Sequence, residues 1–261
     1  TGNLCPWAGE MVGTTAFCAR RRIPGHRVVI AQIDTGFMLD HPALQGRLVS
    51  DGIDLSGDGR ANAAYDTRQR GATYWHATAV ASVLAGNTDE NVKILPYKVV
   101  RFGTDTCAAS AVLAAMEDAV AKGARVLNMS LSTSQNRAGF AAMMDKAAAL
   151  GVAVCCSAGN AGAQVSNRYP SALPQTITVS AVTADKTVAG FSNYGDLVDY
   201  CAPGSHITVA TMDSGGAPAA TTASGTSLSC PYGAACCALL LSLHPDLTLG
   251  QLNALLQGSA E

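Results

Sequence analysis

Apolar runs of two lengths alternate along this chain of 261 residues, and the alternation narrows the folds that it can adopt. Short runs rich in Val, Ile and Leu are typical of buried strands, whereas longer runs rich in Ala, Leu and Met are typical of helices. The strand-like runs are residues 28–33, 92–100, 126–130, 152–156, 176–182 and 207–210. One helix-like run starts at His76, and the others are residues 108–122, 138–150, 227–243 and 249–256. This order predicts an α/β fold of three layers, a mainly parallel twisted sheet with helices on both faces.

The composition predicts a single domain over residues 1–261. With 48% hydrophobic and 14% charged residues, the chain can bury a large core. We find no internal repeat, no low-complexity linker and no uninterrupted apolar run of roughly 18 residues, so neither a second domain nor a membrane span is expected. The net charge of −2 and the lack of a long basic block argue against nucleic acid as a partner.

A short polar segment precedes the apolar run of residues 232–241. Its sequence is Ser224-Gly225-Thr226-Ser227-Leu228-Ser229-Cys230-Pro231. A hydroxyl in the first turn of a buried helix lies beside unpaired backbone N–H groups and the positive end of the helix dipole, which suits a nucleophile. By itself the segment equally fits an ordinary helix cap. A catalytic serine also needs a base and an acid that orients the base.

Two other segments offer that base and that acid. Asp34 ends the first strand-like run, and groups at the carboxyl end of a strand face the ligand crevice of an α/β sheet. His76 starts a helix-like run, where the helix dipole favours a neutral imidazole. In isolation, Asp34 would be an Asx turn and His76 a hydrogen-bonded structural histidine.

The order of these segments resembles the subtilisin-like serine proteases, the subtilase family. The motifs are Asp34-Thr35-Gly36, His76-Ala77-Thr78 and Gly225-Thr226-Ser227 followed by Pro231. Further segments fall in family order: residues 126–131, residues 152–162, Tyr169-Pro170, residues 191–195 and Ala202-Pro203-Gly204. The resemblance covers roughly residues 25–258, nearly the whole chain.

The resemblance implies a serine endopeptidase that hydrolyses peptide bonds through an acyl-enzyme. Ser227 would be the nucleophile, His76 the general base and Asp34 the residue that orients His76. The Asn160 amide and the backbone N–H of Ser227 would form the oxyanion hole.

The resemblance also implies residues that bind substrate. Ser130, Leu131 and Ser132 would pair with the extended substrate backbone. Ser157, Ala158 and Gly159 would line the primary specificity pocket. Because Ser132 stands where many members have Gly, we expect a small or medium uncharged side chain at P1, the substrate residue that supplies the scissile carbonyl.

Three departures from the family pattern concern activity and metal binding. Ala77 replaces the Gly that usually follows the catalytic His, which would strain the backbone at positive φ. Leu228 stands where many members carry an oxidisable Met. Ala43 replaces an Asp that commonly holds calcium, and the loop of residues 86–91 is short, so we expect the strongest family calcium site to be absent. We predict no metal ligand in this chain, and the chemistry requires no cofactor.

The expected partner is a polypeptide substrate, and the protein is expected to be a monomer. By resemblance, the chain is a mature form whose removed propeptide acts as an inhibitor, and it is secreted. Nine cysteines would instead favour a reducing compartment such as the cytoplasm. Cys5 and Cys18, in a region that reads as a loop, are the best candidates for a local disulfide bond.

Three alternative functions compete with the protease. The first is a catalytically silent binding module on the same fold. The replacement of the usual Gly by Ala77 keeps this alternative open. The second is an esterase or lipase of the α/β-hydrolase type, disfavoured because the motif around Ser227 lacks the Gly-x-Ser-x-Gly pattern. The third is a peptide-ligating relative, although no inserted element that could exclude water is visible.

Overall fold

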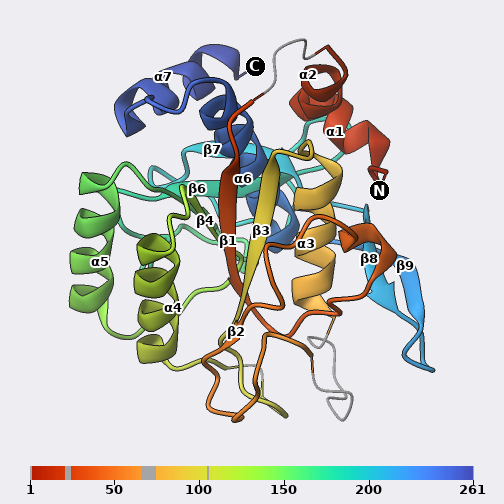
Figure 1. Ribbon diagram of the computed structural model, residues 1–261. Helices are drawn as coiled ribbons and strands as arrows, with labels where there is room; N and C mark the ends of the chain where they lie inside the picture. Colours follow the sequence, from red (N-terminus) through yellow and green to blue (C-terminus); the bar gives the residue numbers. More distant parts are fainter. Residues whose placement is uncertain (1, 21–24, 66–74, 105, 261) are drawn as a thin grey trace.

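The computed structural model describes residues 2–20, 25–65, 75–104 and 106–260. Seven parallel strands form its main sheet, in the order β2-β3-β1-β4-β5-β6-β7 (Figure 1). The strands are β1 (Val28–Asp34), β2 (Ile53–Asp54), β3 (Val92–Lys98), β4 (Val126–Met129), β5 (Ala153–Ser157), β6 (Ile177–Val182) and β7 (Tyr200–Pro203). The prediction of an α/β fold with a mainly parallel sheet is confirmed.

The central strands are almost continuously apolar because both faces of the sheet are covered. Every residue of β4, β5 and β6 is buried, and β1 has one partly exposed residue, Val29. A parallel sheet requires crossover connections, and these place helices over both faces. This is why the strand-like runs lack the polar alternation of a half-exposed sheet.

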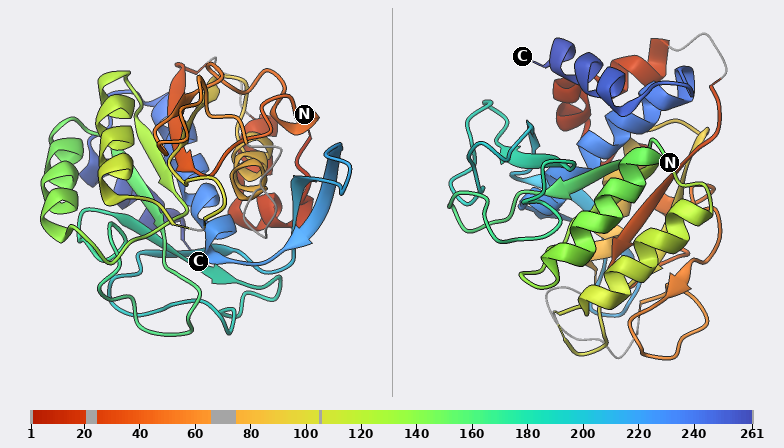
Figure 2. Two further views of the ribbon diagram at one scale, coloured as in Figure 1. Left: turned by 90° about the horizontal axis from the view of Figure 1, so that it is seen from below. Right: turned by 90° about the vertical axis from the view of Figure 1, so that its left-hand side faces the viewer.

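Two apolar clusters separate the three layers. The helices α3 (His76–Gly86) and α6 (Thr226–Leu243) belong to one cluster, and α4 (Ala109–Ala121) and α5 (Arg137–Ala149) belong to the other. Figure 2 shows the sheet between these pairs. A short 3₁₀ helix η1 (Pro42–Leu44) contacts α3, and α7 (Leu249–Ser259) packs on α6.

Helix α6 runs through the middle of the molecule. It contacts strands β1, β3, β4, β5, β6 and β7 as well as α3. Among the described residues it is the one helix that is long and apolar enough to cross a membrane, judged by length and composition. Most of α6 is buried inside this domain, as in the core helix of a globular protein.

The N-terminal region is helical, contrary to the expectation of a loop. Helix α1 (Pro6–Val12) has Pro6 in its first turn, and α2 (Thr14–Arg20) follows after the left-handed Gly13. Ala8 is fully buried in the core cluster. No disulfide bond joins Cys5 to Cys18, so that prediction is wrong; Cys5 is instead a buried core residue.

One strand-like run lies outside the main sheet. Strand β8 (Ile207–Met212) pairs antiparallel with β9 (Pro218–Ala223) in a separate two-stranded sheet. The connection of residues 213–217 is too short for a parallel crossover, and the Asp213 carboxylate accepts hydrogen bonds from the N–H groups of Gly215 and Ala217. β8 contacts α3, while β9 has mostly exposed and partly exposed residues.

Candidate active site

Residues far apart in the sequence meet at the carboxyl edge of the main sheet. Asp34 is the last residue of β1, Ser130 follows β4, and Ser157 is the last residue of β5. From β1 the chain continues to β2 and β3 on one side of β1, and then to β4 and β5 on the other side, so the strand order changes direction between β1 and β4. Such a switch point opens a crevice outside the carboxyl ends of the strands, which is where α/β proteins bind ligands.

The Asp34 carboxylate contacts the His76 ring. Its Oδ1 atom lies 2.7 Å from His76 Nδ1, and the backbone N–H of Thr35 donates to the same oxygen at 2.7 Å. Gln32 Nε2 donates to Oδ2 at 3.2 Å. The side chain of Asp34 is 1% exposed, so these hydrogen bonds replace its hydration. Because a carboxylate only accepts, the neutral His76 ring carries its proton on Nδ1 and keeps Nε2 as an acceptor.

The charge of Asp34 determines the direction of the pKa shift of His76. Burial is the largest single influence and favours the neutral ring. The charge of the Asp34 carboxylate and its hydrogen bond act in the opposite direction, and together they raise the pKa of His76 above the ordinary 6.5. The helix dipole, which the sequence suggested would favour neutral imidazole, is outweighed by this contact.

Ala77 has an ordinary helical backbone. It lies in the first turn of α3, fully buried, and is not among the described residues with positive φ. Its N–H donates to Thr35 Oγ1 at 3.0 Å, and its carbonyl accepts from Gln32 Nε2 at 2.8 Å. The alanine is therefore unstrained, and its contacts hold the start of α3 against the end of β1.

Ser227 lies in the first turn of α6, over the end of β4. Ser130 Oγ donates to its backbone carbonyl at 2.8 Å, and Asn128 Nδ2 donates to Ser130 Oγ at 3.3 Å. Below them, Cys230 Sγ lies 3.3 Å from Asn128 Oδ1. Burial raises the pKa of Cys230 to about 12, so its thiol stays protonated and packs under the first turn.

The Asn160 side chain is oriented by Thr226. Its Oδ1 accepts from the backbone N–H of Thr226 at 2.8 Å and from Thr226 Oγ1 at 2.9 Å. Its Nδ2 therefore points away from Thr226. A Cβ atom placed on Gly225 would lie 3.5 Å from this Nδ2 and 3.9 Å from both Ser227 N and Ser227 Oγ. These three polar atoms border one small space, which Gly225 leaves open.

A cleft of about 440 Å³ lies along this edge of the sheet. Its lining residues are Asp34, Thr35, His76, Val100, Thr106, Cys107, Ser130, Leu131, Ser132, Thr133, Ser134, Gln135 and Arg168. It includes three of the six predicted substrate-binding residues, Ser130, Leu131 and Ser132. Ser157, Ala158 and Gly159 do not line it, but Gly159 N–H donates to Thr226 Oγ1 at 3.1 Å, next to Ser227.

Sequence reasoning missed Cys107 and Arg168 as cleft residues. Arg168 directly precedes the Tyr169-Pro170 motif, which was the only available signal for its position. Cys107 reaches the cleft because residues 100 and 107 form an isolated antiparallel bridge. Burial, followed by the charge of Asp34, raises the pKa of the Cys107 thiol.

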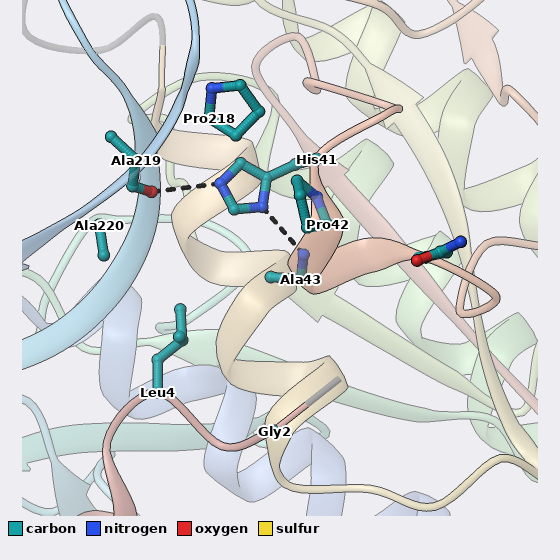
Figure 3. A pocket seen from close by; sticks show the side chains of 9 residues that line it. Gly2, Leu4, His41, Pro42, Ala43, Pro218, Ala219 and Ala220 are labelled. Atoms are coloured by element: carbon teal, nitrogen blue, oxygen red, sulfur yellow. Dashed lines mark hydrogen bonds between the residues drawn. The ribbon is translucent and has the colours of Figure 1, made fainter.

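A second hollow, of about 510 Å³, lies beside β9 and contains none of the four candidate catalytic residues (Figure 3). The His41 ring closes one side of it: Nδ1 accepts from the N–H of Ala43 at 3.0 Å, and Nε2 lies 3.2 Å from the carbonyl of Ala219. In the described part of the chain, no three His, Cys, Asp or Glu side chains gather as a metal site would require.

Comparison with known proteins identifies the family. The model of the subtilase family, Peptidase_S8, matches residues 25–261. The chain belongs to the subtilase family. It is accordingly a subtilisin-like serine protease, a hydrolase. Subtilisin DY from Bacillus licheniformis is 32% identical over 248 residues, covering 90% of this chain and 84% of the relative.

Two solved structures support the assignment of the fold. A cold adapted subtilisin-like serine proteinase is 32% identical with a TM-score of 0.74, and the match covers 92% of this chain and 84% of that chain. A lanthipeptide protease is 24% identical with a TM-score of 0.82, covering 98% and 87%. The chain spans between 49% and 61% of the length of several other curated relatives.

Proposed function

We propose that this chain is a serine endopeptidase that cleaves peptide bonds through an acyl-enzyme, with Ser227, His76 and Asp34 as its triad. The observation that carries the proposal is the 2.7 Å contact between Asp34 and His76, at the edge of the sheet where Ser227 also lies. This contact leaves His76 Nε2 as an acceptor on a ring that lines the cleft. Membership in the subtilase family supports the same roles.

In the proposed first step, Ser227 Oγ attacks the scissile carbonyl carbon while His76 Nε2 takes the hydroxyl proton. The carbonyl oxygen becomes an oxyanion, which the Ser227 N–H and Asn160 Nδ2 stabilise. His76 then donates its proton to the leaving amine, the C–N bond breaks, and an ester to Ser227 remains. Water attacks this ester with His76 again as base, which releases the acid and restores Ser227.

Asn160 is the proposed side-chain donor to the oxyanion. Both hydrogen bonds to its Oδ1 come from Thr226, so Nδ2 faces the space left by Gly225. A donor held in place before the reaction stabilises developing charge without reorganising. We expect Asn160→Ala to lower kcat by about 10²–10³, the loss known for the corresponding change in subtilisin.

Labelling with a fluorophosphonate, combined with a peptide cleavage assay, tests the proposal. The wild type is expected to label and to cleave, and Ser227→Ala is expected to do neither, with kcat lower by about 10⁶ as in subtilisin. Ser224→Ala, which removes a hydroxyl from the same motif, is the matched control and is expected to keep both activities. Labelling of Ser227→Ala at the wild-type rate would refute the assignment, and a wild type that neither labels nor cleaves would favour the silent module.

We further propose that the mature chain acts as a monomer in an extracytoplasmic compartment and that a removed propeptide inhibits it. The family resemblance supports these proposals. If all nine cysteines are counted as free thiols after protein from the natural source is denatured, a reducing compartment would instead be favoured. Adding the propeptide to the cleavage assay tests whether it inhibits the enzyme. The mass measured by light scattering tests whether the protein is a monomer.

A further inference from the structure

The cleft beside His76 contains one charged side chain that the proposed chemistry does not use. Among the residues that line it, Asp34 and His76 are paired with each other, and the only other charged group is Arg168. No carboxylate of the described residues lies within ion-pair distance of the Arg168 guanidinium. Arg168 is exposed, so the guanidinium is available to a ligand in the cleft.

The backbone holds Arg168 opposite the wall formed by residues 130–135. Its neighbour Tyr169 is buried and exchanges two hydrogen bonds with Thr133, at 3.0 Å and 2.7 Å. The carbonyl of Arg168 accepts from the N–H of Ala172 at 2.7 Å and from Ser171 Oγ at 3.2 Å. The main chain on both sides of the cleft is therefore tied together, and the side chain of Arg168 starts from a fixed position.

The chemistry of this part of the cleft suits a carboxylate. A guanidinium presents a rigid fork of N–H donors that matches the two oxygens of a carboxylate. The facing wall adds further donors, the hydroxyls of Ser132, Thr133 and Ser134 and the amide of Gln135. Among the residues that line the cleft, Asp34 is the only acidic one, and its carboxylate is 1% exposed and hydrogen-bonded to His76.

We propose that Arg168 makes the enzyme selective for Asp or Glu at P1. The inference rests on the proposed function and deepens it, because it names the substrate class. The sequence by itself favours a small or medium uncharged P1 residue, since residues 130–132 and 157–159 carry no charged side chain. Arg168 belongs to neither segment and reaches the cleft through the Thr133–Tyr169 pairing.

Matched peptides that differ only in Glu, Gln or Lys at P1 test this selectivity. For the wild type, kcat/KM is expected to be roughly tenfold or more higher for Glu than for Gln, the scale of a charge-assisted hydrogen bond. Arg168→Gln should bring this ratio near one while cleavage of the Gln peptide is retained, and Arg168→Glu should favour Lys. Arg137→Gln, an exposed arginine at the start of α5 outside the cleft lining, is the control and should keep the wild-type ratio.

A binding measurement separates failure of this inference from failure of the proposed function. Calorimetry on Ser227→Ala, with product peptides that end in Glu or Gln, needs no turnover. Tighter binding of the Glu peptide, lost in the Arg168→Gln, Ser227→Ala double variant, supports the role of Arg168. Normal fluorophosphonate labelling with equal binding and cleavage of Glu and Gln peptides would overturn the inference and leave the protease intact. A selectivity for Glu that persists in Arg168→Gln would also overturn it.

Discussion

His76 illustrates how one contact between distant residues sets the chemistry of a side chain. Its position at the start of α3 favours the neutral ring, and so does its burial. The Asp34 carboxylate at 2.7 Å outweighs both and raises the pKa of His76. The base is therefore more basic than a free imidazole, which helps it to take a proton from Ser227.

The pH profile of hydrolysis reports this shift. Because His76 acts as a base only when neutral and its pKa is raised, kcat/KM should rise with pH through a midpoint above 6.5. In Asp34→Asn the raising influence is lost while burial remains, so the midpoint should move to lower pH and the plateau should fall roughly 10⁴-fold. Profiles of both proteins on one peptide check this, and an unchanged midpoint in Asp34→Asn would contradict it.

Leu228 determines how the site responds to oxidants. It follows Ser227 directly, is 3% exposed and has no sulfur to oxidise. The raised pKa of Cys107 keeps the thiol in the cleft protonated and slow to react. We expect the wild type to keep most of its activity in peroxide and Leu228→Met to lose it, with Leu228→Ile as the control of similar volume. Residual activity and mass spectra of active-site peptides measure this, and rapid wild-type loss through oxidation in the cleft would contradict it.

At the scale of elements, a buried arginine joins the loop after α3 to the segment after η1. Arg47 is 5% exposed and donates to the carbonyls of Ala85, Thr88, Asp89 and Val92 and to the hydroxyl of Thr88. The guanidinium N–H groups bind several oxygen atoms of the loop at once, as a bound metal cation would. The short loop of residues 86–91 is thus ordered by a charge within the chain.

Removing the guanidinium group of Arg47 should destabilise the fold. Arg47→Met leaves several buried carbonyls without a donor, so we expect a loss of about 3–5 kcal/mol in the free energy of unfolding. Arg47→Lys keeps the charge but not the fork and should lose part of that energy. Urea unfolding measures both, with the exposed Arg27→Met as the control. A loss in Arg47→Met no larger than in Arg27→Met would show that the hydrogen bonds add little net stability.

At the scale of the whole molecule, we expect stability to be independent of calcium. Arg47 gathers the loop after α3, and Ala43 stands where the family commonly has a carboxylate. We predict that EDTA leaves the melting temperature unchanged and that added calcium does not raise it. Scanning calorimetry with and without each additive is the measurement, with a calcium-dependent subtilisin as the positive control. A drop of several degrees in EDTA would indicate a metal site.

The pattern of the sequence predicted five of the seven strands of the main sheet, β1 and β3 to β6, and the helices α3 to α7, because their signals are local. It did not predict the short edge strands β2 and β7. Continuous apolar runs such as residues 28–33 mark strands that are buried on both faces. The N-terminal helices were missed because α1 and α2 are only seven residues each and carry no long apolar period. Packing of Ala8 and Cys5 against the core stabilises them, and that packing depends on distant residues.

The sequence alone therefore determined the α/β architecture, because hydrophobic periodicity depends on residues that are close together in the chain. Its motifs also singled out Asp34, His76, Asn160 and Ser227 as candidates. Only the tertiary structure decided which way the pKa of His76 shifts, how Asn160 is oriented, and that Arg168 and Cys107 lie in the cleft. The physical reason is the same in each case. Charge, burial and hydrogen bonding act through space, between residues such as Asp34 and His76 that are 42 positions apart.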